Sequence, residues 1–401
     1  MLELLAPAGN MEKLKTAFYY GADACYFAGT KYGLRAYAGN FTDENLIESV
    51  NYAHKLGKKA YVTVNIIAHN EDFADMENYI KFLYKIGVDA VIVADVGIIS
   101  LIRKVCPDLD VHVSTQANIT NKYAAKFFTD MGVKRLVLAR ELSVKEIKEI
   151  RDYIPADVEI ETFVHGAMCI SYSGRCLLSN YLTNRDSNKG ACVQACRWEY
   201  TIHEKSRDNE EYPIYEDNRG TYILNSKDLN MLNHLQELVD AGVTSFKIEG
   251  RMKSIYYVAT VVNAYRRAID QLGTKKSVAA LLEELNKTSH RNYTTGFYFG
   301  SNNKECLSSS TPVQTHEFMA VVLSDNKDGR VLIEQRNRFK VGEVLEVLSP
   351  TNTFNKQIEV TSMLNEKGEE VPDALGVQQK LYLKTKLKLS AGDILRKKIE
   401  N

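Results

Sequence analysis

The sequence predicts an α/β protein: a (β/α)8 barrel of the TIM type with a cysteine-rich insertion after strand seven, followed by a small C-terminal β-barrel domain. Three observations predict this fold. Runs rich in Val, Ile and Ala alternate with amphipathic helical stretches, giving eight units over about 270 residues, the count and size of such a barrel. A long polar, cysteine-containing stretch separates the seventh strand from the eighth. Towards the C-terminus the apolar period changes to two, which indicates strands.

The eight strands are expected at short apolar runs bounded by loop residues. They are Glu3–Ala6, Ala24–Ala28, Lys59–Asn65, Ala90–Ala94, Val111–Thr115, Arg135–Ala139, Glu159–Val164 and Ser245–Glu249. An open, doubly wound sheet would also alternate strands with helices. It would usually have fewer strands and a G-x-G-x-x-G turn after the first one, which this sequence lacks. The closed barrel is therefore the favoured fold.

Helices between the strands follow from apolar residues at i, i+3 and i+4. Clear examples are Thr42–Leu56, Asp75–Ile86, Ser143–Tyr153 and the last barrel helix, Tyr256–Asp270. Several helices are followed by a glycine that can adopt the left-handed C′ conformation. These are Gly57, Gly87, Gly132 and Gly242, and each precedes the next strand by only a few residues.

Two domains are expected. The barrel domain covers residues 1–300 and contains the insertion, residues 166–243, which is far longer than an ordinary βα loop. The second domain covers residues 312–401. Its period-two segments are FMAVVLS, RVLIEQR, EVLEVLS, IEVTSML and KLYLKTK, with an Asn-Lys-Asp-Gly turn between the first two. The phrase RFKVGEVLEVLSP resembles small β-barrels of translation factors and RNA-modifying enzymes.

Composition sets the outer limits. The 45% hydrophobic and 25% charged fractions of the 401 residues are those of a soluble globular protein. Lys plus Arg equals Asp plus Glu, so any contact with nucleic acid must come from local basic patches. We expect no signal peptide and no bilayer-spanning segment, because the N-terminus lacks a basic region and no apolar run is long enough. Clustered cysteines without an export signal indicate a reducing cytoplasm and metal chemistry rather than disulfides.

Four of the seven cysteines lie between Glu161 and Trp198, with the spacings C-x6-C, C-x15-C and C-x3-C. They are Cys169, Cys176, Cys192 and Cys196. Iron–sulfur clusters accept four thiolates at varied spacings. Structural zinc also accepts four, but usually from C-x2-C pairs, which are absent. Four buried, unliganded thiols are the third alternative. The spacing favours the cluster and leaves all three open.

In a TIM barrel the loops after the strands form the active-site face. The polar residues expected there give our candidates. For catalysis they are His165 and Glu249, together with Glu161 inside the seventh strand. For substrate binding they are Arg140, Arg251, Lys253 and Gln116, together with Arg175 beside the cysteines. Barrel strands also end in polar loops without any function, but that alternative is harder to sustain for the whole ring of polar residues.

Peptide hydrolysis finds no support in the motifs, because H-E-x-x-H and G-x-S-x-G are absent. His165 and Cys169 could form a nucleophilic pair. A nucleophilic cysteine normally stands alone, however, whereas this one lies among three others.

The run EIETFVHGAMCISYSGRCLLSNYLTNRDSNKGACVQACRWEY resembles the signature of the collagenase-like "U" peptidase family, number thirty-two in that series. The opening ELLAPAG…GADACYFAG, the segments KKAYVTVN and HVSTQANITN, and FKIEGRMKSIYYVATVVNAYRRAID resemble the same family, so the match covers most of the chain. Within the family the sequence is most similar to the tRNA hydroxylation branch, the prephenate-dependent uridine hydroxylases.

The resemblance implies a [4Fe–4S] cluster on the four clustered cysteines, prephenate as co-substrate, and the tRNA anticodon loop as partner. The expected reaction converts the wobble uridine to 5-hydroxyuridine. Sister branches hydroxylate a ribosomal RNA cytidine or assist ubiquinone hydroxylation. Hydroxylation of another RNA base and a non-catalytic iron–sulfur accessory role stay open as alternatives, and a collagenase-like peptidase is a weaker one.

Such a reaction requires the base to be unstacked and inserted into a pocket. Aromatic residues interleave with cations in the insertion, as in single-strand binding sites. They are Tyr172, Tyr181, Trp198 and Tyr200, and core aromatics are the alternative interpretation. Because prephenate carries two carboxylates, we expect bidentate arginine partners among Arg140, Arg175 and Arg251.

Overall fold

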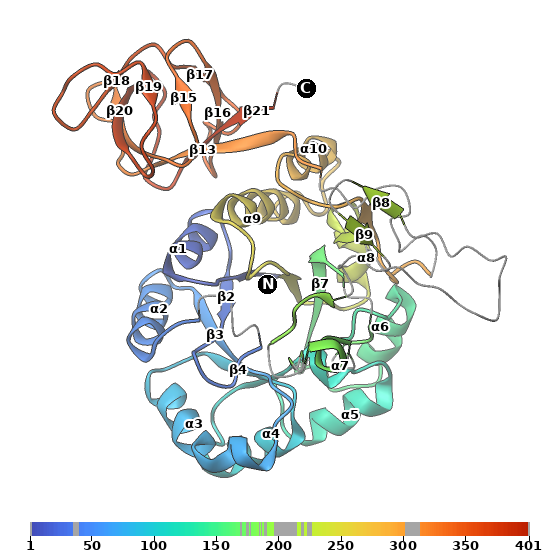
Figure 1. Cartoon of the computed structure of the whole chain (residues 1–401). Coiled ribbons are helices and arrows are strands. Elements are labelled where there is room, and N and C mark those ends of the chain that lie inside the picture. The colour runs from blue at the N-terminus through green and yellow to red at the C-terminus, as the bar shows by residue number, and fades with distance from the viewer. Residues whose placement is uncertain are drawn as a thin grey trace.

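The computed structural model describes residues 2–34, 40–168, 171–173, 176, 178–183, 185, 187, 191–195, 215–217, 220–222, 227–300 and 313–399. A ring of parallel strands forms the centre of the larger domain, and helices surround it (Figure 1). The strand order β11-β1-β2-β3-β4-β5-β6-β7 closes through a direct pairing of β7 with β11. The predicted (β/α)8 barrel is confirmed.

The eight barrel strands lie where the apolar runs predicted them. They are β1 (Glu3–Pro7), β2 (Ala24–Phe27), β3 (Lys59–Val64), β4 (Ala90–Val93), β5 (Val111–Val113), β6 (Arg135–Val137), β7 (Glu159–Ala167) and β11 (Ser245–Ile248). Strand β7 continues three residues beyond the predicted end. Its extension passes close to β11 at Gly166, where a Cβ atom would lie 2.6 Å from the carbonyl oxygen of Glu249. With a φ of 110°, this position requires glycine.

An outer ring of helices follows the strands (Figure 1). It comprises α1 (Met11–Tyr19), α2 (Asp43–Lys55), α3 (Met76–Lys85), α4 (Val96–Val105), α5 (Lys122–Asp130), α6 (Val144–Arg151), α8 (Leu235–Asp240) and α9 (Ile255–Ile269). Side chains cap many of these helices. Ser143 and Glu146, for example, form a reciprocal capping box at the start of α6. All four predicted C′ glycines have positive φ, between 66° and 90°.

Short strands extend the barrel sheet beside the end of β7. Strand β10 (Asp228–Asn230) pairs antiparallel with β7, opposite His165 to Ala167. Strand β12 (Tyr293–Thr294), which follows α10 (Ala279–Leu285), pairs parallel with β10. This extension brings the chain that leaves the last barrel helix back to the carboxyl end of β7.

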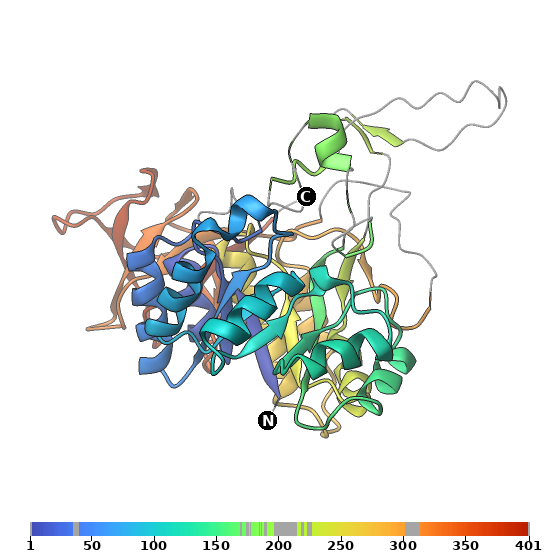
Figure 2. The ribbon, with the colours of Figure 1, turned by 90° about the horizontal axis from the view of Figure 1, so that it is seen from below.

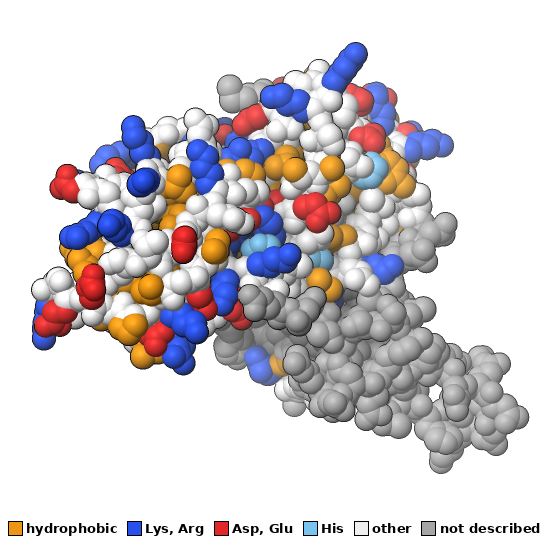
Figure 3. Space-filling model, turned by 90° about the horizontal axis from the view of Figure 1, so that it is seen from above, with side chains coloured by type: hydrophobic (Ala, Val, Ile, Leu, Met, Phe, Trp, Pro, Cys, Tyr) orange, Lys and Arg blue, Asp and Glu red, His pale blue; other side chains and the backbone are white. Residues whose placement is uncertain are grey.

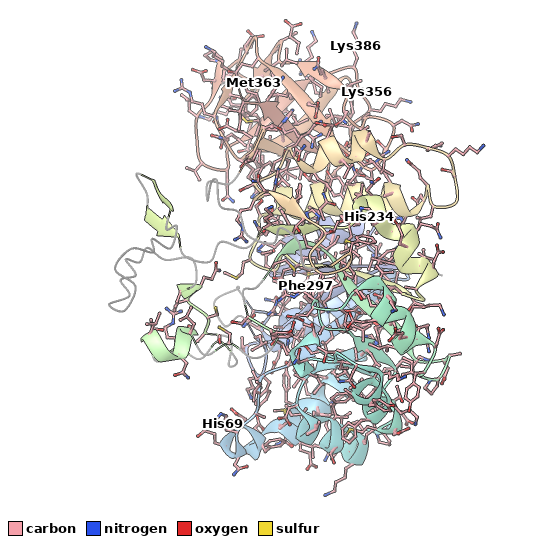
Figure 4. The ribbon with its side chains drawn as sticks, turned by 90° about the vertical axis from the view of Figure 1, so that its right-hand side faces the viewer. His69, His234, Phe297, Lys356, Met363 and Lys386 are labelled. Carbon is pink, nitrogen blue, oxygen red and sulfur yellow. The ribbon has the colours of Figure 1, made fainter. Side chains whose placement is uncertain are left out.

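The described helix of the insertion lies at the carboxyl ends of the barrel strands. Figure 2 shows α7 (Leu178–Thr183) above that end of the barrel, on the side away from the N-terminus. The insertion also contains a small hairpin, β8 (Tyr215–Asp217) with β9 (Gly220–Tyr222). The side containing α7 is also that of His69 (Figure 4), which precedes the 3-10 helix η1 (Asn70–Ala74).

The C-terminal domain is the predicted antiparallel β domain. Its seven-stranded sheet has the order β17-β16-β21-β13-β14-β20-β18, and β15 pairs with β19 in a separate ribbon. The bounds are β13 (His316–Val322), β14 (Arg330–Gln335), β15 (Phe339–Lys340), β16 (Val344–Leu348), β17 (Gln357–Glu359), β18 (Met363–Leu364), β19 (Asp373–Ala374), β20 (Lys380–Lys384) and β21 (Ile394–Lys398). The predicted turn is a two-residue hairpin with positive φ at Asp328 and Gly329.

The C-terminal domain packs on α1, α9 and α10 (Figure 1). The ring of Phe318 stacks on Tyr256 at a centroid distance of 5.7 Å. The hydroxyl group of Tyr20 donates a hydrogen bond to the carbonyl oxygen of Leu348 at 2.8 Å. Because Leu348 and Ile394 belong to the same hydrophobic core as the barrel, the two domains share part of their buried interior.

Candidate functional site at the barrel mouth

Hydrogen bonds hold the start of the insertion against the barrel mouth. We use this term for the carboxyl end of the barrel strands. The backbone N–H of Ser173 donates to Oε1 of Glu141 at 3.1 Å. The Ser173 hydroxyl also lies 3.4 Å from Oγ1 of Thr115, which is the first residue of η2 (Thr115–Ala117). Since Thr115 follows β5 and Glu141 follows β6, these contacts hold the cysteine-containing segment over the mouth.

Two of the four predicted cluster ligands, Cys176 and Cys192, lie within the described residues, and both are half-buried and without a disulfide. Hydrogen bonds join the segments that carry them. Ser187 donates from Oγ to the Cys176 carbonyl oxygen at 2.7 Å, and the backbone N–H of Val193 donates to Oγ of Ser179 at 3.1 Å. The backbone N–H of Gln194 donates to Sγ of Cys192 at 3.4 Å, the kind of contact that stabilises thiolate ligands.

The other two predicted ligands, Cys169 and Cys196, lie outside the described residues, as does Arg175. Within the described part of the chain, no group of three or more His, Cys, Asp or Glu side chains is placed to hold a metal ion. Because half of the cysteine quartet lies beyond that part, the four-cysteine site stays a prediction.

His165 is buried near the end of β7 in a cage of aromatic rings. The ring centres of Tyr257, Tyr265 and Tyr293 lie 6.0, 5.4 and 5.5 Å from that of His165. The hydroxyl of Tyr265 donates to the carbonyl oxygen of Val164 at 2.7 Å, so its oxygen can accept a hydrogen bond from Nδ1–H of His165 at 3.3 Å. Burial lowers the pKa of His165 to about 3. The imidazole is therefore neutral at pH 7, with its lone pair on Nε2.

Two further candidates adjoin this cage, through Tyr257. The Tyr257 hydroxyl donates to the carbonyl oxygen of Glu249 at 2.9 Å, and the Lys253 ammonium lies 5.1 Å from the Tyr257 ring centre. The Glu249 carboxylate lies 3.3 Å from the hydroxyl of Tyr26. The structure therefore brings together His165, Glu249 and Lys253, as the sequence predicted for residues of one site.

Arg140 lies beside the same strand end. Its guanidinium donates to the carbonyl oxygen of Ala167 at 3.2 Å and lies 5.6 Å from the ring centre of Phe163. Gln116 is in η2, next to Thr115, and its backbone N–H donates to Oγ of Ser114. Both residues are thus at the mouth, near the fastened start of the insertion. Their roles in substrate binding stay predictions.

Arg251 occupies a different part of the mouth. Its guanidinium donates to the carbonyl oxygen of Leu34, and its own carbonyl oxygen accepts from Lys13 at 3.1 Å. The side chain is 5% exposed. Arg251 therefore helps to hold the loop after β2 against the loop after β11. Because Nη2 already donates to Leu34, a contact with substrate would have to use another N–H group of the guanidinium.

Glu161 lies at the opposite end of the barrel from the mouth. Its carboxylate accepts from Arg135 at 3.0 Å and from Lys247 at 2.7 Å, inside a network that also contains Glu3 and Ser245. Glu3, Arg135 and Ser245 are the first residues of their strands, so the network fills the amino end of the barrel. Catalysis by Glu161 stays a prediction, and this position favours a structural role.

Four residues in or just before the strands β10 and β12 complete this side of the mouth, and sequence reasoning missed them. Arg291 donates to Oδ1 of Asp228 from Nη2 at 2.9 Å and from Nε at 3.2 Å, and its backbone N–H donates to Oδ2. Burial alone would raise the pKa of Asp228, but the charge of Arg291 brings it below its usual value. His290 stacks on Tyr293 at 4.2 Å, with the rings 7° from parallel.

A signal for these residues does exist in the sequence. The segment His290-Arg291-Asn292-Tyr293 combines two ring systems and a cation within four residues, directly after the last barrel helices. On the face shown in Figure 3, histidine side chains lie next to Lys or Arg side chains.

Comparison with known proteins places the chain in a family. The sequence model of peptidase family U32 matches residues 9–308, and that of the U32 C-terminal domain matches residues 314–396. The chain is 42% identical to tRNA hydroxylation protein P1 of Bacillus subtilis, over 98% of this chain and 94% of the relative. It is 40% identical to tRNA hydroxylation protein P of Escherichia coli, over 93% of this chain and 91% of the relative.

A third relative is a 23S rRNA 5-hydroxycytidine synthase of Escherichia coli, 40% identical over 68% of this chain and 40% of that protein. Within the described residues, no helix combines the length and apolarity that crossing a bilayer demands. Because the two sequence models together cover both domains, and the first two relatives match nearly end to end, the chain belongs to peptidase family U32.

Proposed function

We propose that the protein is an RNA hydroxylase, and more narrowly that it converts the wobble uridine in a tRNA anticodon loop to 5-hydroxyuridine. The observation that carries the proposal is the identity of 40–42%, over more than nine-tenths of this chain, to proteins named for tRNA hydroxylation. The relative that makes 5-hydroxycytidine in 23S rRNA supports the same chemistry at C5 of a pyrimidine.

The barrel mouth offers the environment that such a reaction needs. A pyrimidine must leave its stack before its C5 atom can be reached, and a flipped base is held by aromatic surfaces and hydrogen bonds. The cage of Tyr257, Tyr265 and Tyr293 around His165 supplies buried rings beside a neutral imidazole. We propose that the part of the mouth beside this cage receives the base.

Replacing C5–H with C5–OH is a two-electron oxidation of the base, so a redox-active group is expected. We propose a [4Fe–4S] cluster on Cys169, Cys176, Cys192 and Cys196. When bound, such a cluster can bind a substrate oxygen or transfer single electrons. The hydrogen bond from Gln194 to Cys192 and the serine contacts that join the Cys176 and Cys192 segments fit a thiolate site.

We further propose prephenate as the source of the hydroxyl oxygen. This dianion needs cations that present paired donors, which arginine does better than lysine. Arg140 is our first candidate because its guanidinium lies at the end of β6, beside the end of β7. Lys253 and Gln116 are further candidates. Peptidase activity, which the family name suggests, is not proposed, because the sequence contains neither H-E-x-x-H nor G-x-S-x-G.

Nucleoside analysis of cellular tRNA tests the proposal. A strain that lacks the gene should lose 5-hydroxyuridine and its derivatives from tRNA, and a plasmid copy should restore them. A plasmid carrying Cys176→Ser should not restore them, whereas Cys106→Ser, at a buried cysteine outside the insertion, should. Unchanged 5-hydroxyuridine in the deletion strain would refute the proposed activity.

A further inference from the structure

His290 is held rigidly next to the aromatic cage of the mouth. It stands three residues before β12 and forms an isolated antiparallel bridge with Val313, with backbone hydrogen bonds of 3.1 and 2.7 Å. Its ring lies flat on Tyr293, and Tyr293 in turn contacts His165 at 5.5 Å between ring centres. One tyrosine ring thus connects the two imidazoles.

The hydrogen bonds of His290 fix its tautomer. Nδ1 lies 2.7 Å from the carbonyl oxygen of Arg291, and a carbonyl oxygen can only accept, so Nδ1 carries the proton. Burial also lowers the pKa of His290. The ring is therefore neutral at pH 7, and Nε2 is a hydrogen-bond acceptor with no proton to give.

That acceptor has no partner among the described residues. Nε2 of His290 is buried, the residue is 6% exposed, and the described residues provide no hydrogen bond to this atom. The neighbouring groups are already engaged, since both oxygens of Asp228 accept from Arg291. Buried polar atoms nearly always have partners in folded proteins, and an exception at a functional mouth indicates a donor that arrives with a ligand.

We propose that Nε2 of His290 accepts a hydrogen bond from the N3–H group of a uracil base, and that His290 thereby makes this site select uridine over cytidine. The inference rests on the proposed function, in which a pyrimidine enters the mouth. Uracil carries a donor at N3, whereas cytosine carries a lone pair at the same position. A fixed acceptor therefore attracts the first base and repels the second.

The tautomer is essential to this selectivity. If the Nε2 atom carried the proton, it would donate to N3 of cytosine and favour the other base. The carbonyl oxygen of Arg291 excludes that tautomer for as long as it accepts from Nδ1. His290 is a specificity-determining residue in this account, and the bond changes at C5 do not involve it.

Binding and turnover of two anticodon stem-loops, identical except for U or C at the wobble position, test the inference. The proteins are the cluster-loaded wild type, His290→Ala, His290→Gln and the control His54→Ala, whose histidine is on the outer helix α2 beside Asp89. Equilibrium dissociation constants come from fluorescently labelled RNA without prephenate. Relative kcat/KM values come from mass analysis of nucleosides with prephenate present.

We expect wild type and His54→Ala to prefer the U RNA on the order of 10- to 100-fold, the range for one buried polar mismatch. His290→Ala should lose most of that preference by binding the U RNA more weakly. A glutamine amide can rotate to offer either its oxygen or its NH2 group, so His290→Gln should bind the C RNA more tightly than wild type does. A gain of that kind cannot come from misfolding.

Three results would overturn the inference: equal binding of both RNAs by wild type, an undiminished preference in a folded His290→Ala, or no gain for the C RNA in His290→Gln. A U preference that depends on His290, without hydroxylation of either RNA, would uphold the inference while refuting the proposed function. The two failures are therefore distinguishable.

Discussion

Arg396 of β21 and Glu284 of α10 form a fully buried, two-point ion pair between the C-terminal domain and the barrel domain. The Nη2 to Oε2 distance is 2.9 Å, a second contact joins Nη1 to Oε1, and both side chains are 0% exposed. Glu346 and Lys287 extend the pair into a network across the same interface. The domain junction is thus held by paired charges as well as by the shared core.

Breaking this pair from one side should destabilise the protein strongly. Glu284→Gln removes the fully buried carboxylate that faces Arg396 and leaves it the less buried Glu346, so we expect a loss near the lower end of the typical range of about 3–5 kcal/mol. Urea unfolding measures the loss. The exposed pair of Arg338 and Asp373 provides the control, and Arg338→Ala should cost about 0–1 kcal/mol. Equal effects of the two substitutions would contradict the role of the buried pair.

Loosening the insertion should reduce activity without unfolding the barrel. Glu141→Ala removes the carboxylate that accepts from Ser173, a charged hydrogen bond for which about 1.5–3 kcal/mol is typical. We expect faster proteolytic cleavage within the insertion and at least a several-fold drop in tRNA hydroxylation, at an unchanged thermal midpoint. Glu149→Ala, on the exposed face of α6, is the matched control. Unaltered cleavage would show that the Ser173 contact does not hold the insertion.

Stability should fall as the pH drops from 6.5, in part because of His165. Its pKa is about 3 in the folded protein, so only the unfolded chain takes up this proton between pH 6.5 and about 3. The group's stabilising contribution is complete above pH 6.5 and decreases by at most about 1.4 kcal/mol per pH unit below it. His112, His290 and His316 act in the same direction, since burial lowers each pKa.

Urea unfolding of His165→Gln at pH 7 and pH 5 measures the contribution of His165 to the pH dependence of stability. The variant should be less stable than wild type at pH 7, and the difference should narrow at pH 5. A parallel pH dependence of His165→Gln and wild type would mean that the histidine is protonated in the folded protein.

Replacing Arg140 should weaken the binding of prephenate more than the binding of tRNA. Arg140→Lys keeps the charge but loses the planar pair of donors, so we expect the KM for prephenate to rise about tenfold or more, with a smaller change in the KM for tRNA. Steady-state assays with each substrate varied in turn measure both constants. A rise confined to the tRNA constant would place Arg140 on the RNA instead.

The barrel was predictable because its strands are buried on both faces. Such strands are uninterrupted runs of apolar residues, as in Ala90–Val93, and these runs can be recognised in the sequence. The short strands β10 and β12 were not, since each has only two or three residues and depends on partners distant in the sequence. Strand β21 was missed for another reason. It buries Ile394, Leu395 and Arg396 in succession, which abolishes the alternation that marked the other strands.

Some residues of the candidate site could likewise be placed from the sequence, and others could not. His165 directly follows one predicted barrel strand and Glu249 ends another, and in a TIM barrel the carboxyl ends of all strands meet at one mouth. The position of Glu161 was visible, but its partners Arg135 and Lys247 come from other strands, so only the structure shows that it joins a buried charge network. Asp228 and His290 depend on the unpredicted sheet extension. Sequence patterns could not place them.

The most direct test of the central claim is mass analysis of a purified reaction. Anaerobically purified protein with its iron–sulfur absorbance near 400 nm is mixed with unmodified tRNA and prephenate labelled with heavy oxygen. The account predicts 5-hydroxyuridine at the wobble position carrying the label, and none with Cys176→Ser or without prephenate. Unmodified tRNA from fully loaded protein, or 5-hydroxyuridine formed equally well without the cluster, would contradict it.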